Sequence, residues 1–338
     1  MAIRGQFMPT SSSISAIEAV SLEKTYNTRQ GFWKRSTHTT EAVRGISFWV
    51  NQGELFGILG PNGAGKTTTV KMLSTLLIPT SGKIHIFGQD IIAHTNEIRK
   101  RIGFTFGGAR GLYGRLTAEE NLRYFAELYA LPPKTTRKRI DELLELVNLL
   151  ERKNDKVETF SSGMQQRLHI ARALLHDPEI IFLDEPTVGI DPVGARELRA
   201  MVKNLKEHGK TILLTTHYMA EADELCDRIA IINKGKIVAL DSPANLKNQM
   251  TDDHRVELIV SSEHLLLVKN ALSQLGSKEK ITYADHAFHT SIIIQTPRLG
   301  TVIELLSPLL NNGLIQNLDV RNQTMEDVYV TIIQNEEK

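Results

Sequence analysis

Short apolar runs alternate with amphipathic stretches through the first part of the chain. Ile46 to Val50 and Leu55 to Leu59 are apolar runs bounded by turn residues and predict strands. Glu179 to Leu183 and Thr211 to Thr215 are apolar and rich in β-branched residues, as buried parallel strands are. Lys66 to Leu77 predicts a helix. Strands that alternate with helices in this way indicate an open α/β sheet.

A mostly helical segment interrupts this alternation. Its amphipathic stretches run from Glu119 to Tyr129 and from Arg139 to Leu150, which predicts a helical subdomain of about residues 98–160. The polar and basic residues Asn27 to Thr40 predict a long loop. Its Phe32-Trp33-Lys34-Arg35 segment is either a membrane-surface or adenine-contacting element or a flexible loop, and the sequence leaves both open. Residues 1–16, with a Ser run, predict a mobile leader.

A second unit is expected after about Met250. Its pattern gives the order strand, helix, strand, strand, helix, strand, which is the ferredoxin-like arrangement, and a last helix from about Thr324 to Ile333. The sequence thus predicts two domains, residues 17–250 and 251–338. The second carries no phosphate loop and no convincing acid–base group. It is therefore expected to stabilise or regulate a dimer rather than to carry chemistry.

Composition agrees with two folded domains and excludes several classes of protein. The chain has 338 residues, of which 41% are hydrophobic, and a formal net charge of +1. That charge gives no indication of a nucleic-acid partner. Cys226 is the only cysteine, which excludes an internal disulfide framework. No run reaches the ~18–20 apolar residues that a bilayer crossing needs, so a transport function would require a pore formed by another chain.

A glycine-rich segment between a predicted strand and a predicted helix matches the Walker A phosphate loop. It consists of Gly60, Pro61, Asn62, Gly63, Ala64, Gly65, Lys66 and Thr67. Glycines let backbone N–H groups turn toward phosphate oxygens, and the helix presents its positive end to the same anion. Lys66 is expected to reach the β- and γ-phosphates, and Thr67 to hold Mg²⁺. A glycine-rich turn without function is the alternative, and the flanking elements argue against it.

Two carboxylates end the apolar strand at Ile180 to Leu183. They resemble Walker B followed by a catalytic glutamate: Asp184 would hold Mg²⁺, through water, and Glu185 would polarise the attacking water. A solvated acidic turn after a strand is the alternative. The upstream phosphate loop favours the catalytic interpretation.

The segment Phe160-Ser161-Ser162-Gly163-Met164-Gln165 lies about twenty residues before these carboxylates and opens a predicted helix, Met164 to Leu175. It resembles the ABC signature sequence, usually written LSGGQ. The resemblance to the ABC ATPase family covers roughly Ile17 to Leu246. It includes Tyr26 at the adenine-stacking position, Asp191 within a D-loop, and His217 as the switch histidine.

This resemblance implies a P-loop NTPase fold, with a RecA-like core, an antiparallel β subdomain and an inserted helical subdomain. It implies an ATPase with ATP and Mg²⁺ as cofactors. The implied catalytic residues are Glu185, His217 and Lys66, and the implied metal ligands are Thr67 and Asp184. The implied nucleotide contacts are Tyr26, the phosphate loop with Thr68, Ser161, Ser162, Gly163 and Asp191. The signature faces the nucleotide of another subunit, so the family's site needs a second copy or a homologous ATPase subunit, joined head-to-tail around two ATP molecules.

The sequence segments around these motifs resemble those of the ATPases of ABC-2-type, daunorubicin-resistance-like exporters. The segments are Gly111 to Thr117, Glu119 to Leu122, and Thr216 to Ala222. The resemblance implies a peripheral subunit at the cytoplasmic face of the membrane that energises a separate permease for a drug, lipid or polysaccharide. The alternative is a soluble ABC ATPase acting on a macromolecular machine such as the ribosome or DNA. One set of motifs, no heptad run and no basic tail disfavour it. Glu185 and His217 disfavour a third class, a regulatory module without turnover.

Two departures from the family pattern change what is expected locally. Ser162 and Met164 stand where Gly and Gln are usual, so Ser162 must adopt a negative φ, and positive φ is expected at Gly163. The Q-loop glutamine has no counterpart in Phe106 to Arg110. We therefore expect no side-chain oxygen of that segment to ligate Mg²⁺, and water to take the position.

Overall fold

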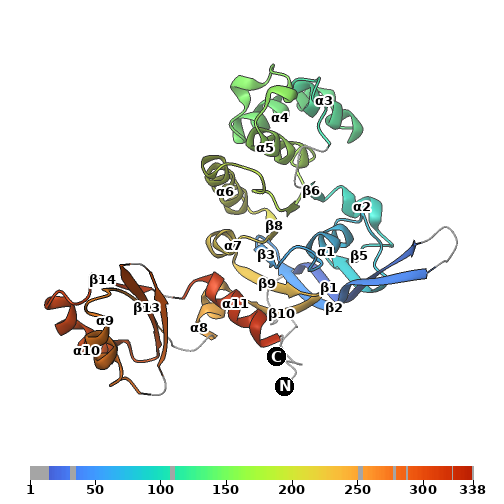
Figure 1. Cartoon of the computed structure of the whole chain (residues 1–338). Coiled ribbons are helices and arrows are strands. Elements are labelled where there is room, and N and C mark those ends of the chain that lie inside the picture. The colour runs from blue at the N-terminus through green and yellow to red at the C-terminus, as the bar shows by residue number, and fades with distance from the viewer. Residues whose placement is uncertain are drawn as a thin grey trace. The chain divides into compact units, whose positions relative to one another are not determined.

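The computed structural model describes residues 15–30, 36–106, 111–249, 254–276, 279–286, 288–321 and 323–336. The chain divides into two compact units, Met1–Ser242 and Pro243–Lys338 (Figure 1). Of the regions predicted above, most of the leader, the Phe32-Trp33 segment and the Q-loop residues 107–110 lie outside the described residues. In the described part, no helix combines the length and the apolar composition needed to cross a bilayer.

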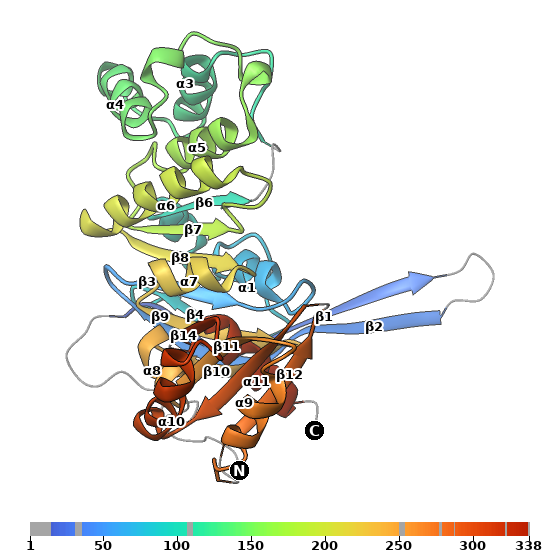
Figure 2. The ribbon, with the colours of Figure 1, turned by 60° about the vertical axis from the view of Figure 1, so that its left-hand side comes forward.

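A six-stranded sheet forms the centre of the first unit, in the order β10-β9-β3-β8-β7-β6 (Figure 2). Five strands are parallel, and β10 pairs antiparallel with β9. Every residue of β3, β7 and β8 is buried, as their mostly apolar and β-branched residues predict. The strands are β3 (Leu55–Leu59), β6 (Ile102–Phe106), β7 (Ile180–Asp184), β8 (Thr211–Thr216), β9 (Arg228–Asn233) and β10 (Lys236–Asp241). The helices between them are α1 (Lys66–Leu73), α2 (Thr95–Arg99), α6 (Pro192–Glu207) and α7 (Met219–Leu225).

The first helix is shorter than the hydrophobic pattern predicts. It ends at Leu73 instead of Leu77, because Ser74 caps it and Thr75 adopts the left-handed conformation with φ 64°. An L-residue at positive φ cannot continue a right-handed helix. The apolar residues Leu76 and Leu77 follow the end of the helix rather than forming its last turn.

An antiparallel sheet of order β2-β1-β4-β5 lies beside the phosphate loop. Its strands are β1 (Ser15–Gln30), β2 (Ser36–Asn51), β4 (Ser81–Ile86) and β5 (Gln89–Asp90). The prediction of a long loop from Asn27 to Thr40 is wrong, because β1 and β2 remain paired as far as Gln30 and Ser36. The pairing begins among buried residues such as Ala19 and Phe48, and it continues through β-branched threonines that favour strands. Hydrophobicity alone gives no indication of this polar extension, which Figure 2 shows projecting from the sheet.

Three helices and two short 3₁₀ turns follow β6. They are α3 (Ala118–Leu128), α4 (Pro133–Leu146), η1 (Leu150–Arg152), η2 (Val157–Thr159) and α5 (Ser162–Ala173). Thr117 starts α3 with a capping box, in which its side chain accepts from the Glu120 N–H and its own N–H donates to the Glu120 carboxylate. Ser161 caps the start of α5, where its side chain accepts from the Met164 N–H.

The second unit has the predicted βαββαβ order. Its strands pair antiparallel in the order β12-β13-β11-β14, over a core that includes Val256, Leu258, Ile292 and Val302. This is the ferredoxin-like arrangement. The elements are α8 (Pro243–Gln249), β11 (His254–Ser261), α9 (Leu265–Leu272), β12 (Lys280–Asp285), β13 (His289–Thr296), α10 (Leu299–Asn311), β14 (Asn317–Arg321) and α11 (Met325–Glu336).

Candidate active site

The phosphate loop connects β3 to α1. At two of its glycines it passes close to backbone carbonyl oxygens of other segments. Gly65 has φ 108°, and a Cβ there would lie 2.5 Å from the carbonyl oxygen of Ala42. A Cβ at Gly60 would lie 2.3 Å from the carbonyl oxygen of Ile232. Neither position can hold a side chain without moving backbone, so both require glycine. The loop therefore ends at the N-terminus of α1, where unpaired N–H groups and the helix dipole favour an anion.

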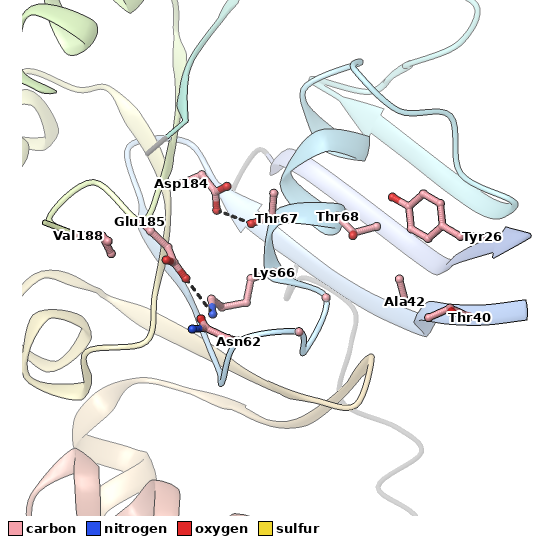
Figure 3. Close-up of a pocket in the computed structure, with 12 residues that line it drawn as sticks. Tyr26, Thr40, Ala42, Asn62, Lys66, Thr67, Thr68, Asp184, Glu185 and Val188 are labelled. Atoms are coloured by element: carbon pink, nitrogen blue, oxygen red, sulfur yellow. Dashed lines mark hydrogen bonds and ion pairs between the residues drawn. The ribbon is translucent and has the colours of Figure 1, made fainter. Parts of the chain in front are cut away.

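A pocket of about 630 Å³ opens at this loop (Figure 3). Of the residues predicted to contact nucleotide or metal or to be catalytic, nine line it: Tyr26, Asn62, Gly63, Gly65, Lys66, Thr67, Thr68, Asp184 and Glu185. Thr40, Ala42 and Val188 also line it and were not predicted. Thr40 is paired with Tyr26 across β1 and β2. A prediction of the β1–β2 hairpin in place of a loop would have paired Thr40 with Tyr26 and so placed it at the pocket.

Two side chains converge on one carboxylate oxygen of Glu185 at the edge of this pocket. The Lys66 ammonium lies 3.1 Å from Glu185 Oε1 and also donates to the Gly60 carbonyl oxygen at 2.8 Å. His217 Nδ1 lies 3.3 Å from the same Glu185 oxygen. Lys66 is 4% exposed, so its charge is paired in a poorly solvated place. The lysine, the glutamate and the histidine predicted to be catalytic are thus brought together.

The backbone of Glu185 is strained in a way that bears on its function. Its φ is 49°, which is uncommon for a residue other than glycine. Its N–H donates to both the carbonyl oxygen and the hydroxyl of Thr215, which hold this conformation. The turn directs the carboxylate toward Lys66 at the end of β7 (Figure 3). Strain held by neighbouring contacts in this way is typical of functional positions.

Asp184 and Thr67 form a small cluster of oxygen atoms beside this carboxylate. The Asp184 side chain is 5% exposed, and its Oδ1 accepts from the hydroxyl of Thr67 at 3.2 Å and from the hydroxyl of Thr215. A carboxylate and a hydroxyl from adjacent elements are the hard ligands that Mg²⁺ prefers. The residues present therefore fit the predicted metal.

The signature residues lie away from the pocket of their own chain. Among the described residues that line the pocket, none belongs to 161–163. Ser162 is helical, as required, and its hydroxyl donates to the Gly189 carbonyl oxygen at 2.8 Å. The prediction of positive φ at Gly163 is wrong, because the cap at Ser161 starts α5 two residues earlier than predicted and makes Gly163 helical. A Cβ at Gly163 would lie 3.2 Å from Ile190 Cγ2, so the position is tightly packed.

Asp191 caps the next helix. Its carboxylate accepts from the N–H groups of Val193 and Gly194, each at 3.0 Å. The hydrogen bond from Gly194 is the main reason why the pKa of Asp191 lies below its usual value. In this structure the residue predicted as a D-loop contact is engaged with α6, and it does not line the pocket.

The family model described as ABC transporter matches residues 43–188. A fluoroquinolones export ATP-binding protein of Mycobacterium tuberculosis is 48% identical over 292 residues, which cover 86% of this chain and 87% of that protein. The chain belongs to the ABC transporter ATP-binding proteins.

Further ABC relatives extend this result. The daunorubicin resistance ATP-binding protein DrrA3 of Streptomyces coeruleorubidus is 35% identical over 291 residues, which cover 86% of this chain and 90% of that protein. A dimeric ATP-binding cassette solved in a post-hydrolysis state with ADP and phosphate matches with a TM-score of 0.59 and 30% identity, over 67% of this chain and 98% of the cassette. The predicted family, its daunorubicin-resistance-like branch, the fold class and the ATPase activity are confirmed. The chain is an ATP-binding and ATP-hydrolysing ABC subunit.

Proposed function

We propose that this ABC subunit hydrolyses ATP with Mg²⁺ and thereby powers an exporter whose membrane-spanning part is a separate chain. The observation that carries the proposal is the convergence of Lys66 and His217 on Glu185 Oε1, at the edge of a pocket lined by the phosphate loop. Tyr26 is 39% exposed and offers its ring to the adenine base of ATP. Lys66 and the α1 N-terminus offer positive charge to the phosphates.

Glu185 acts as the general base in this proposal. The Lys66–Glu185 ion pair holds the carboxylate while no phosphate competes for the lysine. Phosphate oxygens carry more charge than one carboxylate, so bound ATP draws Lys66 toward itself and frees Glu185 to accept a proton from the attacking water. His217, which contacts the same oxygen of Glu185, orients this carboxylate. Thr67 and Asp184 hold Mg²⁺, which neutralises charge on the β- and γ-phosphates when it is bound.

The active form in this proposal is a dimer. Ser161, Ser162 and Gly163 do not line the chain's own pocket, yet they open a helix whose N-terminus favours phosphate. The solved relative is described as a dimer bound to ADP and phosphate. We infer that a second copy, or a homologous ATPase subunit, supplies its signature to this pocket and receives this chain's signature in return, as head-to-tail symmetry requires.

The names of the relatives indicate the direction of transport and the class of cargo. Their names describe a fluoroquinolone export protein, a daunorubicin resistance protein and a linearmycin resistance protein. We infer a drug or antibiotic as the cargo, with the chain bound peripherally to its permease at the cytoplasmic face of the membrane. The alternative, an ABC ATPase acting on a ribosome or on DNA, has no comparable support among these relatives.

Transport by inside-out vesicles tests this proposal. Vesicles that carry this chain and a candidate membrane-spanning partner should accumulate a fluoroquinolone only when both ATP and Mg²⁺ are present, because hydrolysis needs ATP at Lys66 and Mg²⁺ at the Thr67–Asp184 pair. Uptake is measured by filtration, with vesicles that hold the membrane protein alone as the control. Uptake that continues without this chain, or ATP hydrolysis that persists in EDTA, would contradict the proposal.

The second unit is proposed to strengthen self-association of the ATPase units. The match to the solved cassette covers 98% of the cassette but only 67% of this chain. An ATPase unit of this type therefore folds without an added second unit. A second contact between subunits raises their effective concentration and lets the ATP sites open without separation of the dimer.

Deletion of residues 243–338, at the boundary between the two units, should leave ATP binding to the monomer largely intact. It should make the ATPase rate per chain fall steeply on dilution, since self-association then rests on the ATP sites alone. Activity is measured over a range of protein concentrations, with the full chain as the control. A folded truncated chain that binds no ATP, or that shows the same dilution curve as the full chain, would refute this role.

A further inference from the structure

Thr215 is a buried threonine near the end of β8, beside the two acidic residues of the site. β7 and β8 run parallel, and Thr215 is the residue of β8 that pairs with Asp184. A β-branched residue suits a buried strand, and valine would suit it equally well. The strand itself therefore gives no reason for a hydroxyl at this position, so the reason must lie in the contacts of that hydroxyl.

The Thr215 hydroxyl makes two hydrogen bonds, to two adjacent residues. It donates its proton to Asp184 Oδ1, and its oxygen accepts from the N–H of Glu185 at 3.0 Å. Because a hydroxyl group has a single proton to donate, these two bonds fix its orientation. Linked bonds of this kind also polarise and strengthen one another. One buried hydroxyl is thus bonded to the proposed metal ligand and to the backbone of the proposed general base.

The bond to Glu185 acts on a strained part of the backbone. Glu185 has φ 49°, and its N–H is shared between the carbonyl oxygen and the hydroxyl oxygen of Thr215, each at 3.0 Å. A conformation of this kind persists only where the surroundings hold it. It sets the direction in which the side chain leaves the backbone, and therefore where the carboxylate meets Lys66 and His217.

The bond to Asp184 acts on the carboxylate that is proposed to hold Mg²⁺. Asp184 Oδ1 also accepts from the Thr67 hydroxyl at 3.2 Å. Thr67 is itself a proposed ligand of the ion, whereas Thr215 is not. Groups that hydrogen-bond a ligating carboxylate from outside the ligand set fix its orientation, and their loss typically weakens metal binding or activity by roughly 10–100-fold.

We propose that Thr215 is a positioning residue for both acidic residues of the site. Its hydroxyl orients the Asp184 carboxylate for the metal, and it holds the backbone turn that presents Glu185 to the attacking water. The proposal rests on the proposed roles of Asp184 and Glu185, and it adds the group that fixes the two residues relative to each other.

ATP hydrolysis by the full chain is the first test. Thr215→Val removes the hydroxyl, keeps the branched shape and should lower kcat by roughly 10-fold or more. Binding of ATP in EDTA should change little, because Thr215 is not among the described residues that line the pocket. The variant should fold, since Asp184 keeps the Thr67 hydroxyl and the Glu185 N–H keeps the Thr215 carbonyl oxygen.

A second measurement reports on the metal site without turnover. Mn²⁺ accepts the same oxygen ligands as Mg²⁺, and its binding to the chain in the presence of ADP is measured by electron paramagnetic resonance. Thr215→Val should weaken this binding by roughly 10-fold. Thr215→Ser keeps the hydroxyl and should restore most of both kcat and Mn²⁺ affinity. If Thr215→Val does not fold, Thr215→Ala takes its place, because alanine and serine both lack the methyl group and only serine keeps the hydroxyl.

Thr211→Val is the matched control. Thr211 begins the same strand and is 2% exposed, and its hydroxyl oxygen accepts from the N–H of Gly53 at 3.0 Å. The substitution therefore removes a buried, hydrogen-bonded hydroxyl from the other end of β8. It should leave both kcat and the affinity for Mn²⁺ unchanged.

Each alternative outcome overturns the role of Thr215 and leaves the proposed function intact. These outcomes are normal kcat and Mn²⁺ affinity in Thr215→Val, an equal loss in Thr211→Val, and no recovery in Thr215→Ser. A loss in only one of the two measurements also overturns the proposal that one hydroxyl serves both residues. Normal hydrolysis by Glu185→Gln would instead remove the general base from the proposed function, and the Mn²⁺ measurement would still decide whether Thr215 orients Asp184.

Discussion

Replacement of Glu185 by glutamine should lower ATP hydrolysis by roughly 10²–10⁴-fold, the usual contribution of a positioned general base. The amide has nearly the same size as the carboxylate, so the left-handed backbone at Glu185 and its bonds to Thr215 should persist. ATP binding should remain, and it should become tighter, because the variant removes the carboxylate that competes with phosphate for Lys66. Slow hydrolysis with retained binding should also trap an ATP-bound dimer.

Single-turnover hydrolysis and size-exclusion chromatography with ATP measure both effects. Glu207→Gln, which makes the same change at an exposed position on α6, is the control and should behave as the unsubstituted chain does. A Glu185→Gln chain that hydrolyses ATP at a near-normal rate would show that another group activates the water.

The parts of the site that follow from local sequence could be predicted, because residues adjacent in the sequence determine their conformation. The phosphate loop needs glycine at Gly60 and Gly65 to let backbone pass at 2.3 and 2.5 Å, and these glycines are visible in the sequence. Asp184 and Glu185 end an apolar strand, and the C-terminal ends of parallel strands β3 and β7 lie on one edge of the sheet. Topology then brings Thr67 to Asp184, although the two residues are 117 positions apart in the sequence.

The parts that depend on long-range pairing could not be predicted in the same way. Thr40 joins the pocket because it pairs with Tyr26, and no local pattern shows that a polar, threonine-rich stretch continues a hairpin. The conformation of Gly163 depends on where α5 starts, and the cap at Ser161 decides that. The buried Glu221 belongs to a segment to which hydrophobic periodicity assigns no special role, and only its burial, at 3% exposed, distinguishes it.

Gly163→Asp should abolish most ATP hydrolysis, by roughly 10²-fold or more, without weakening ATP binding to a single chain. Loss of one preorganised donor to a reacting phosphate has an effect of this size. The added carboxylate would lie in the first turn of α5, where it repels a partner's γ-phosphate. The fold should survive, because an acidic residue in that turn is favourable by about 0.3–1 kcal/mol. Its Cβ at 3.2 Å from Ile190 Cγ2 needs only a small adjustment of that side chain.

Gly163→Ala carries the same Cβ without the charge and should retain most of the activity, which separates the electrostatic effect from packing. Mixing tests whether the site is shared between chains. A Lys66→Ala chain and a Gly163→Asp chain are each inactive alone, but their mixed dimer contains one site with an intact phosphate loop and an intact signature. An equimolar mixture should recover about a quarter of the normal rate, since half of the dimers are mixed and each has one working site. If mixed dimers form and stay inactive, or if Gly163→Asp abolishes ATP binding by the isolated chain, the signature does not act on the partner's nucleotide.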